Sequence, residues 1–308
     1  MSYELRNISF LFLLGSIMFC SCVQEFPLEI HDTEIPVVNC ILTNDAVQTL
    51  SLTWSVKITD GYAFKEIKEA RVTLFADSEH IGEFERTGYG NWQLRYQPVA
   101  GTNYRLSVQL PDGKELTATT TMPERNRFIA DATNNHYPSK YFRQQTADNP
   151  CWIFVLSEQS LADNLMHPVP SSKATLMSDI GTDHPLIDRF NEHGNLLDLV
   201  PQSTTPAYAF YLRIQQSSLS DGEEIPFCLQ TLYGDYAYIF FRTASREYDQ
   251  YLKSSLLKMF MYRSEDDPIQ WFDESKVYSN ITNGTGIFAA CNDSYIYFFG
   301  DLFRDVDN

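Results

Sequence analysis

The chain of 308 residues is long enough for about two domains, and its 44% hydrophobic and 14% aromatic residues are typical of folded cores rather than of wholesale disorder. The formal net charge is −17 and the sequence has no cluster of lysine and arginine, which excludes a nucleic-acid binder that works by displacing counterions from phosphates. The acidity indicates a soluble, self-repelling surface.

The N-terminus predicts export and lipidation. An apolar run of 12 residues, 8–19, is too short to span a bilayer and fits the core of a signal peptide. It leads into Cys20-Ser21-Cys22, which resembles the lipobox of bacterial lipoproteins, where a cysteine after a small residue is acylated and becomes the new N-terminus. Cys22 follows the small Ser21 and is the predicted acceptor, whereas Cys20 follows a bulky phenylalanine and is the alternative. A plain signal peptide with incidental cysteines is the other interpretation.

A tether and a β-sandwich domain are predicted next. Residues 1–21 are the predicted signal peptide, and residues 22–33 are polar and acidic, as expected of a lipidated tether. Within 34–124, short runs alternate between apolar and polar residues with period two, and Pro111-Asp112-Gly113 predicts a hairpin turn. About seven strands in some 90 residues are typical of an immunoglobulin-like or transthyretin-like β-sandwich.

A linker and a β-rich C-terminal domain follow. Residues 125–150 are predicted to be a linker or loop, because 131–150 is polar and poor in aliphatic side chains. Residues 151–308 are predicted to form a β-rich domain with buried strands at 151–156, 208–214 and 236–241. A short helix is predicted to start near Asp183 and to end at Gly194.

One main helix is predicted over 245–263. Apolar side chains recur there at i, i+3 and i+4 from Tyr248 to Phe260, and Ser245 can cap the first turn. This stripe indicates core packing rather than a cofactor site. The expected fold class is therefore mainly β, with a sandwich followed by a β-rich domain that carries one main helix.

The cysteines and histidines give no metal-ligand pattern. Four cysteines follow the signal, and burial as free thiols or pairing as disulfides both remain open; they are Cys40, Cys151, Cys228 and Cys291. No CxxC or Cys/His spacing suggests zinc. His167, His184 and His193 share a loop-rich region and are predicted to be solvated. We expect no metal and no cofactor.

The sequence also lacks the common catalytic motifs. The chain after the signal contains no GxSxG, HExxH or P-loop, and we expect no catalytic residue and no enzyme. Gly284 and Gly286 lack the third glycine and the lysine of a phosphate loop, and the apolar residues after them favour a strand. Asn283-Gly284 predicts a tight turn, and Gly286 permits a positive φ or a close backbone approach before Phe288 turns inward.

Four segments in chain order resemble a Bacteroidota outer-membrane lipoprotein family, domain of unknown function 4249. They are the lipobox at Cys22, IPVVNCILTN at 35–44, and residues 68–123 and 245–290. The last segment is the most specific, because members typically carry there a serine-asparagine, a glycine pair and a phenylalanine, which correspond to Ser279, Asn280, Gly284, Gly286 and Phe288. Cys40 stands where members often have glycine, and 131–206 matches little.

The resemblance implies a β-sandwich followed by a β-rich domain on an outer-membrane lipoprotein, often encoded beside a TonB-dependent transporter. It brings no catalytic residues. We therefore expect an accessory or binding protein of a TonB-dependent nutrient uptake system, facing the cell surface rather than the periplasm. Its partners would be the membrane, through its lipid, the transporter and an unidentified nutrient. The alternatives are a surface hydrolase acting on peptide or glycan and a structural or adhesive surface lipoprotein.

The lipidation site can be tested directly. We expect Cys22→Ala to abolish acylation and to release the protein from membranes, because two or three acyl chains on one residue are what would hold it there. Mass spectrometry of the mature N-terminus and membrane fractionation measure both effects, with Cys20→Ala as the matched control. Acylation that survives in Cys22→Ala would assign the site to Cys20 or reject the lipobox.

Overall fold

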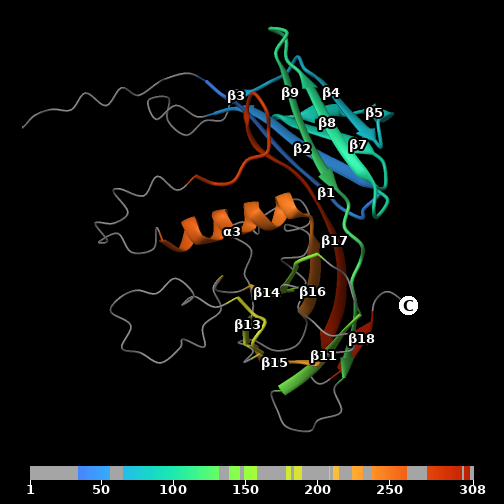
Figure 1. The fold of residues 1–308 in the computed structure, drawn as a ribbon, viewed down its shortest axis with the longest axis vertical. Helices are drawn as coiled ribbons and strands as arrows, with labels where there is room; N and C mark the ends of the chain where they lie inside the picture. The colour runs from blue at the N-terminus through green and yellow to red at the C-terminus, as the bar shows by residue number, and fades with distance from the viewer. Residues whose placement is uncertain are drawn as a thin grey trace, which may run out of the picture. The chain divides into compact units, whose positions relative to one another are not determined.

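A computed structural model describes twelve stretches of the chain, and these form a mainly β fold with one helix among them (Figure 1). The mainly β class predicted from the sequence is confirmed. Cys20, Cys22 and the tether lie outside the described residues. The described residues are 34–55, 65–131, 139–145, 149–157, 178–181, 184–188, 208, 211–214, 224–231, 237–261, 276–299 and 302–305.

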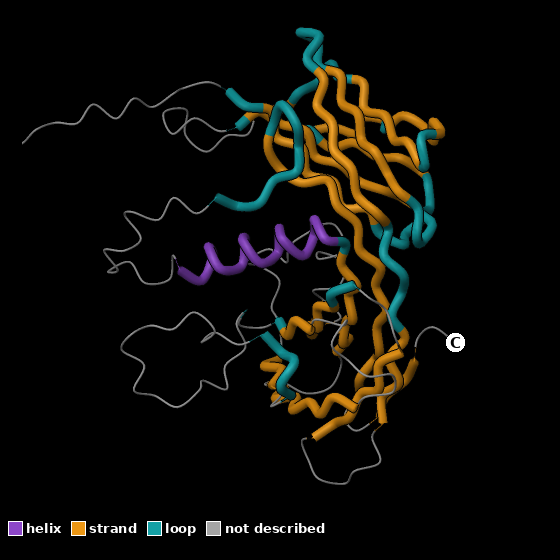
Figure 2. Tube along the Cα trace, viewed as in Figure 1, coloured by secondary structure: helices purple, strands orange, loops and turns teal. Residues whose placement is uncertain are grey.

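The described strands form three sheets (Figure 2). The largest has the order β14-β12-β16-β17-β1-β2-β7-β6, with β3 beside β2 and β18 beside β17; the others are β5-β4-β8-β9 and β10-β11-β15-β13. The strands are β1 (Pro36–Leu42), β2 (Val47–Trp54), β3 (Lys65–Glu66), β4 (Arg71–Ala76), β5 (Glu79–Glu83), β6 (Glu85–Gly88), β7 (Asn91–Arg95), β8 (Asn103–Gln109), β9 (Glu115–Thr121), β10 (Arg127–Asp131), β11 (Ser139–Gln145), β12 (Cys151–Ser157), β13 (Ser178–Gly181), β14 (Leu212–Ile214), β15 (Glu224–Thr231), β16 (Ala237–Ala244), β17 (Thr285–Phe299) and β18 (Leu302–Asp305), and the helix is α3 (Arg246–Met261).

The first core lies between two sheets, as in a β-sandwich. Alternate residues of β1 and β2, such as Val38 and Leu52, pack with alternate residues of β4, β8 and β9, such as Leu74, Leu106 and Leu116. All five are at most 2% exposed. The period-two pattern of the sequence is thus the pattern of side chains that point into this core.

The long strand β17 serves two cores. Its first part, Thr285–Ala290, pairs in parallel with β1, and its second part, from Cys291 on, pairs antiparallel with β16. Phe288 and Ala290 point into the sandwich core, whereas Ile287, Ala289 and Cys291 belong to a second core with α3, β12 and β16. Both faces of this part of the strand are therefore buried, which explains its continuous apolar sequence.

The helix α3 begins where the sequence predicts. The Oγ atom of Ser245 accepts a hydrogen bond from the backbone N–H of Tyr248 at 3.3 Å and one from the N–H of Ala290 at 3.2 Å. Tyr248, Leu252 and Leu256 lie on one face and are buried in the second core. The capping serine thus fixes the helix start on β17 as well as satisfying its first turn.

Several local expectations differ from the structure. β10 and β11 occupy parts of the segment predicted to be a loop, because they pair with each other and β11 pairs with β15. Within the predicted sandwich, the consecutive strands β5 and β6 lie in different sheets. The strand expected over 208–214 reduces to a Tyr208–Tyr211 bridge and β14. Residues 184–188 form a turn and a bridge, where a helix was expected; the rest of that expected helix lies outside the described residues.

Three of the four cysteines are buried, namely Cys40, Cys151 and Cys291, and Cys40 and Cys291 are free thiols. Burial raises the pKa of the Cys40 and Cys291 thiols well above the usual value. The side chain of Cys228 lies outside the described residues. His184 is buried rather than solvated, and its Nδ1 accepts a hydrogen bond from the N–H of Leu186 at 3.3 Å.

Gly286 yields a stability prediction. It has a φ of +109°, and a Cβ there would lie 2.0 Å from the carbonyl oxygen of Val38. We expect Gly286→Ala to lower the free energy of unfolding by about 3–5 kcal/mol, because backbone strain and overpacking each cost about 1–3 kcal/mol. Denaturant unfolding measures the loss.

Gly88 is the matched control, since its φ is +125° and a Cβ there would meet no atom within 4 Å. Gly88→Ala should therefore show the strain alone. Equal losses in the two variants would mean that the approach of β1 does not require a glycine.

Candidate functional site

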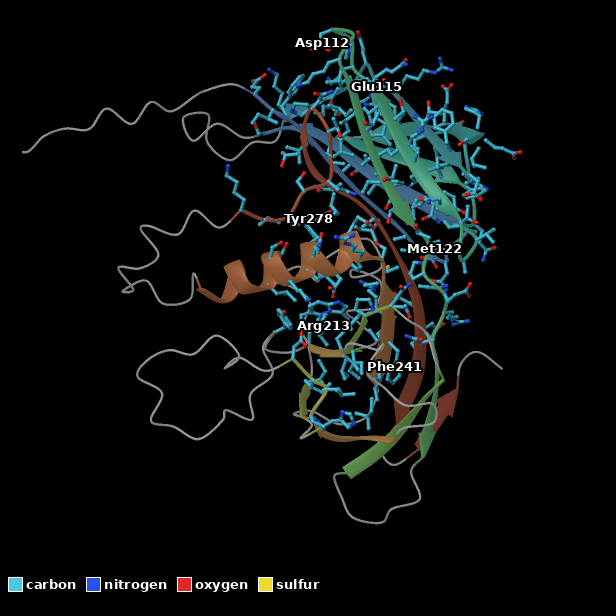
Figure 3. The ribbon with its side chains drawn as sticks, viewed as in Figure 1. Asp112, Glu115, Met122, Arg213, Phe241 and Tyr278 are labelled. Carbon is cyan, nitrogen blue, oxygen red and sulfur yellow. The ribbon has the colours of Figure 1, made fainter. Side chains whose placement is uncertain are left out.

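The family-like segment 278–288 forms a clamp between β9 and β17. Three alternating carbonyl oxygens of β9, those of Glu115, Thr117 and Thr119, accept hydrogen bonds from this segment. The donors are Asn283 Nδ2 at 3.0 Å, the N–H of Thr282 at 2.9 Å and Asn280 Nδ2 at 3.2 Å. Two side-chain amides and one backbone amide thus make the hydrogen bonds that an additional strand would make to the edge of β9. The strand β9 begins at Glu115 (Figure 3).

Asn280 also satisfies the backbone of Phe288. Its Oδ1 accepts from the Phe288 N–H at 2.9 Å, and its Nδ2 donates to the Phe288 carbonyl oxygen at 2.7 Å. The side-chain amide therefore pairs with both backbone groups of one residue, as a residue of a neighbouring antiparallel strand would. Because Phe288 is fully buried, an unpaired backbone group there would be costly.

The other predicted residues of the segment have structural contacts. Asn283 has the positive φ of a tight turn, +62°, and a Cβ on Gly284 would lie 2.8 Å from the Pro36 carbonyl oxygen. Ser279 is exposed, and its Oγ accepts from the N–H of Ile281 at 3.4 Å. The geometry is that of a corner that brings β1, β9 and β17 together, with no helix N-terminus for a phosphate.

A first buried ion pair links α3 to β14. Arg213 donates from Nε to Asp249 Oδ1 at 2.6 Å and from Nη2 to Asp249 Oδ2 at 2.9 Å, and its Nη1 donates to Asp188 at 2.7 Å. The indole N–H of Trp152 donates to Asp249 Oδ1 at 3.0 Å. This bidentate pair beneath α3 fixes the helix on the sheet (Figure 3).

A second buried ion pair links β16 to β17. Arg242 binds both oxygens of Asp293, at 2.8 and 2.6 Å, and donates to the hydroxyl of Tyr248 at 2.9 Å. Burial alone would lower the pKa of Arg242, but the Asp293 carboxylate holds that pKa well above its usual value. In both pairs a guanidinium binds a carboxylate on another element, so the pairs act as structural cross-links between those elements.

Sequence reasoning missed both pairs. The signal that could have found them is an arginine inside a strongly apolar run, as in YLRI around Arg213 and IFFRT around Arg242. A buried arginine requires an anionic partner, although the sequence does not say which one.

An exposed aromatic turn joins β6 to β7. Gly88, Tyr89 and Gly90 all have positive φ, at +125°, +49° and +76°. Glu66 fixes this turn, because its Oε2 accepts from the Gly90 N–H at 3.0 Å and from Arg86 Nη2 at 2.8 Å. The pKa of Glu66 is lowered to about 2, chiefly by its hydrogen bond from Arg86 and also by those from Lys68 and the Gly90 N–H. Tyr89 itself is 94% exposed.

Tyr295 stacks on Phe240 at 5.4 Å between ring centroids and packs against the second core. The histidines His167 and His193 lie outside the described residues. Within the described stretches, no group of three or more His, Cys, Asp or Glu could hold a metal ion. The described part of the chain also has no helix with the length and apolar composition that crossing a bilayer requires.

A family model described as a domain of unknown function, DUF4249, matches residues 23–295, a range that includes the clamp. The chain belongs to this family. A search of curated proteins found no match. Among solved structures, one from Corynebacterium diphtheriae, described as a candidate membrane-anchored protein, is 7% identical with a TM-score of 0.20. The alignment covers 69% of this chain and 55% of that one, so the chain spans just over half of that protein's length.

The clamp yields a second prediction. We expect Asn280→Asp to lower the free energy of unfolding at pH 7 by about 2–3 kcal/mol, because a carboxylate oxygen would face the carbonyls of Phe288 and Thr119 instead of an N–H donor. The repulsion would raise the pKa of the new carboxyl in the folded state. The variant's deficit should therefore be small below about pH 4, the unfolded pKa of Asp, and should grow as pH rises through the raised folded pKa.

Asn283→Asp is the control for this prediction, because Asn283 is exposed and its side chain makes a single hydrogen bond in the clamp. It should cost about 0.5–1.5 kcal/mol, with little dependence on pH. Thermal unfolding at several pH values compares the two variants. A loss in Asn280→Asp that does not change with pH would contradict the proposed geometry.

Proposed function

We propose that the protein is a lipid-anchored outer-membrane protein, facing the cell surface, that serves a TonB-dependent nutrient uptake system. It would bind a nutrient, the transporter or both. The observation that carries the proposal is the short apolar run 8–19 that leads into the predicted acceptor Cys22, with a predicted polar tether over residues 22–33. The family-like segments extend this reading, since the resemblance to outer-membrane lipoproteins implies a neighbouring transporter.

The structure supports a binding scaffold. The described buried charges around Arg213 and Arg242 are engaged in ion pairs that join α3, β14, β16 and β17. The exposed turn at Tyr89 is held by hydrogen bonds to Glu66. A rigid frame with an exposed aromatic loop is how β-sandwich proteins commonly present a contact surface.

The transporter association can be tested at native abundance. We expect affinity purification of the tagged protein from crosslinked, detergent-solubilised membranes to recover a TonB-dependent transporter, identified by mass spectrometry. Cys22→Ala is the matched control and should lose this recovery, because the protein would leave the membrane. A deletion strain should lose uptake of a nutrient rather than attachment to surfaces.

Recovery of the protein without any transporter would reject the association. Loss of attachment with normal uptake would favour the adhesive alternative. Turnover of a peptide or glycan by the purified protein, abolished by one carboxylate or serine substitution, would establish the hydrolase alternative instead.

A further inference from the structure

The end of the sandwich where β1 begins is joined to the Tyr89 turn by side-chain contacts. Both carboxylate oxygens of Glu34, the first described residue, lie 3.0 Å from Lys65 Nζ. Lys65 and Glu66 form β3, and Glu66 accepts from the N–H of Gly90. Tyr89 and Glu34 therefore lie at the same end of the sandwich.

The backbone at Tyr89 is strained without any gain in packing. Its φ is +49°, in the left-handed region, which is unfavourable for a residue with a Cβ. Its side chain is 94% exposed. Glycine or asparagine would occupy this position with less strain, so the fold itself does not explain an aromatic ring here. A contact outside the chain does.

The proposed anchor keeps this end of the sandwich close to the membrane. Glu34 follows Cys22 by 12 residues. Twelve residues of polypeptide cannot span more than about 40 Å. The lipid surface is therefore the partner that an acylated Cys22 would always bring within reach of Tyr89.

The charge around the turn permits approach to a lipid surface. Three positive charges, those of Lys65, Lys68 and Arg86, are ion-paired beside the turn with the carboxylates of Glu34 and Glu66. The whole chain carries −17. Anionic head groups would repel the acidic remainder more than this ion-paired end, which favours one orientation.

We propose that Tyr89 docks this end of the sandwich on the membrane by inserting its ring at the level of the lipid head groups. The inference rests on the lipid anchor of the proposed function. Tyrosine suits the membrane–water interface because its ring is apolar and its hydroxyl is polar. Ile35, 44% exposed and next to Glu34, adds apolar surface at the same end.

The test uses the full, acylated protein in vesicles of phosphatidylethanolamine and phosphatidylglycerol with brominated acyl chains. Tyr89→Trp provides the probe. Val99→Trp is the matched control, because Val99 is 59% exposed and follows β7 at the opposite end of the sandwich. After subtraction of the wild-type signal, we expect the emission of Y89W to shift to the blue and to be quenched by the bromolipid, with no change for V99W.

The other outcomes reject the proposal, and they distinguish a failure of the docking from a failure of the lipid anchor. Equal emission of the two variants on protein whose acylation is confirmed by mass spectrometry overturns the docking and leaves the anchor intact. Protection of Y89W only when a transporter is present assigns the turn to a protein partner and also overturns lipid docking. Absence of the acyl chains removes the anchor and the docking together.

A second substitution removes the ring without straining the turn. Asparagine adopts the left-handed conformation more readily than tyrosine, so Tyr89→Asn should fold with an unchanged or higher melting temperature. Hydrogen exchange of residues 85–91 should slow when the wild-type protein is placed in vesicles, and Tyr89→Asn should lose that protection. Val99→Asn should not. Protection that persists in Tyr89→Asn would show that the ring makes no contact with lipid.

Discussion

The parallel pairing of β1 with β17 is the constraint on which the rest of the structure depends. The two strands come from opposite ends of the described chain, and their backbones approach so closely at Val38 and Gly286 that a side chain on the glycine would overlap a carbonyl. On one face this pair completes the sandwich core, and on the other it forms the floor beneath α3. Such a non-local pairing closes a long loop, so it is expected to form late and slowly.

The clamp at 280–283 and the cap at Ser245 stabilise that pairing from two sides. Asn280 binds the backbone of Phe288, and the Ser245 hydroxyl accepts from the N–H of the nearby Ala290. The hydroxyl of Thr120 in β9 donates to Glu247 Oε2 at 2.8 Å, and its Oγ1 lies 3.1 Å from Ser245 Oγ. The start of the helix, the edge of the second sheet and β17 thus share one hydrogen-bonded region. These shared hydrogen bonds connect the two cores.

The sequence predicted those features that depend on local pattern. The strands of the sandwich follow from period-two alternation, and α3 follows from its apolar stripe and its capping serine. The strands β10 and β11 were not predicted, because their polar segments become strands only when β10 pairs with β11 and β11 pairs with β15. Asn280 was recognised as part of the family-like segment, but its bonds to Thr119 and Phe288 depend on strands that meet only in the folded chain. The arginine pairs required the same long-range information.

The positive φ values of Gly286 and Tyr89 have different explanations. At Gly286 the conformation is explained from within, since the neighbouring strand leaves no room for a side chain. At Tyr89 the conformation places a large ring in solvent. The hydrogen bonds that hold the turn run from Gly90 and Arg86 to Glu66 and do not involve the ring. Strain that no internal contact offsets points to a partner outside the chain. Tyr89 lies at the same end of the sandwich as Glu34, the first described residue, so a lipid anchor at Cys22 would bring the membrane within its reach, and the membrane is the partner that we propose.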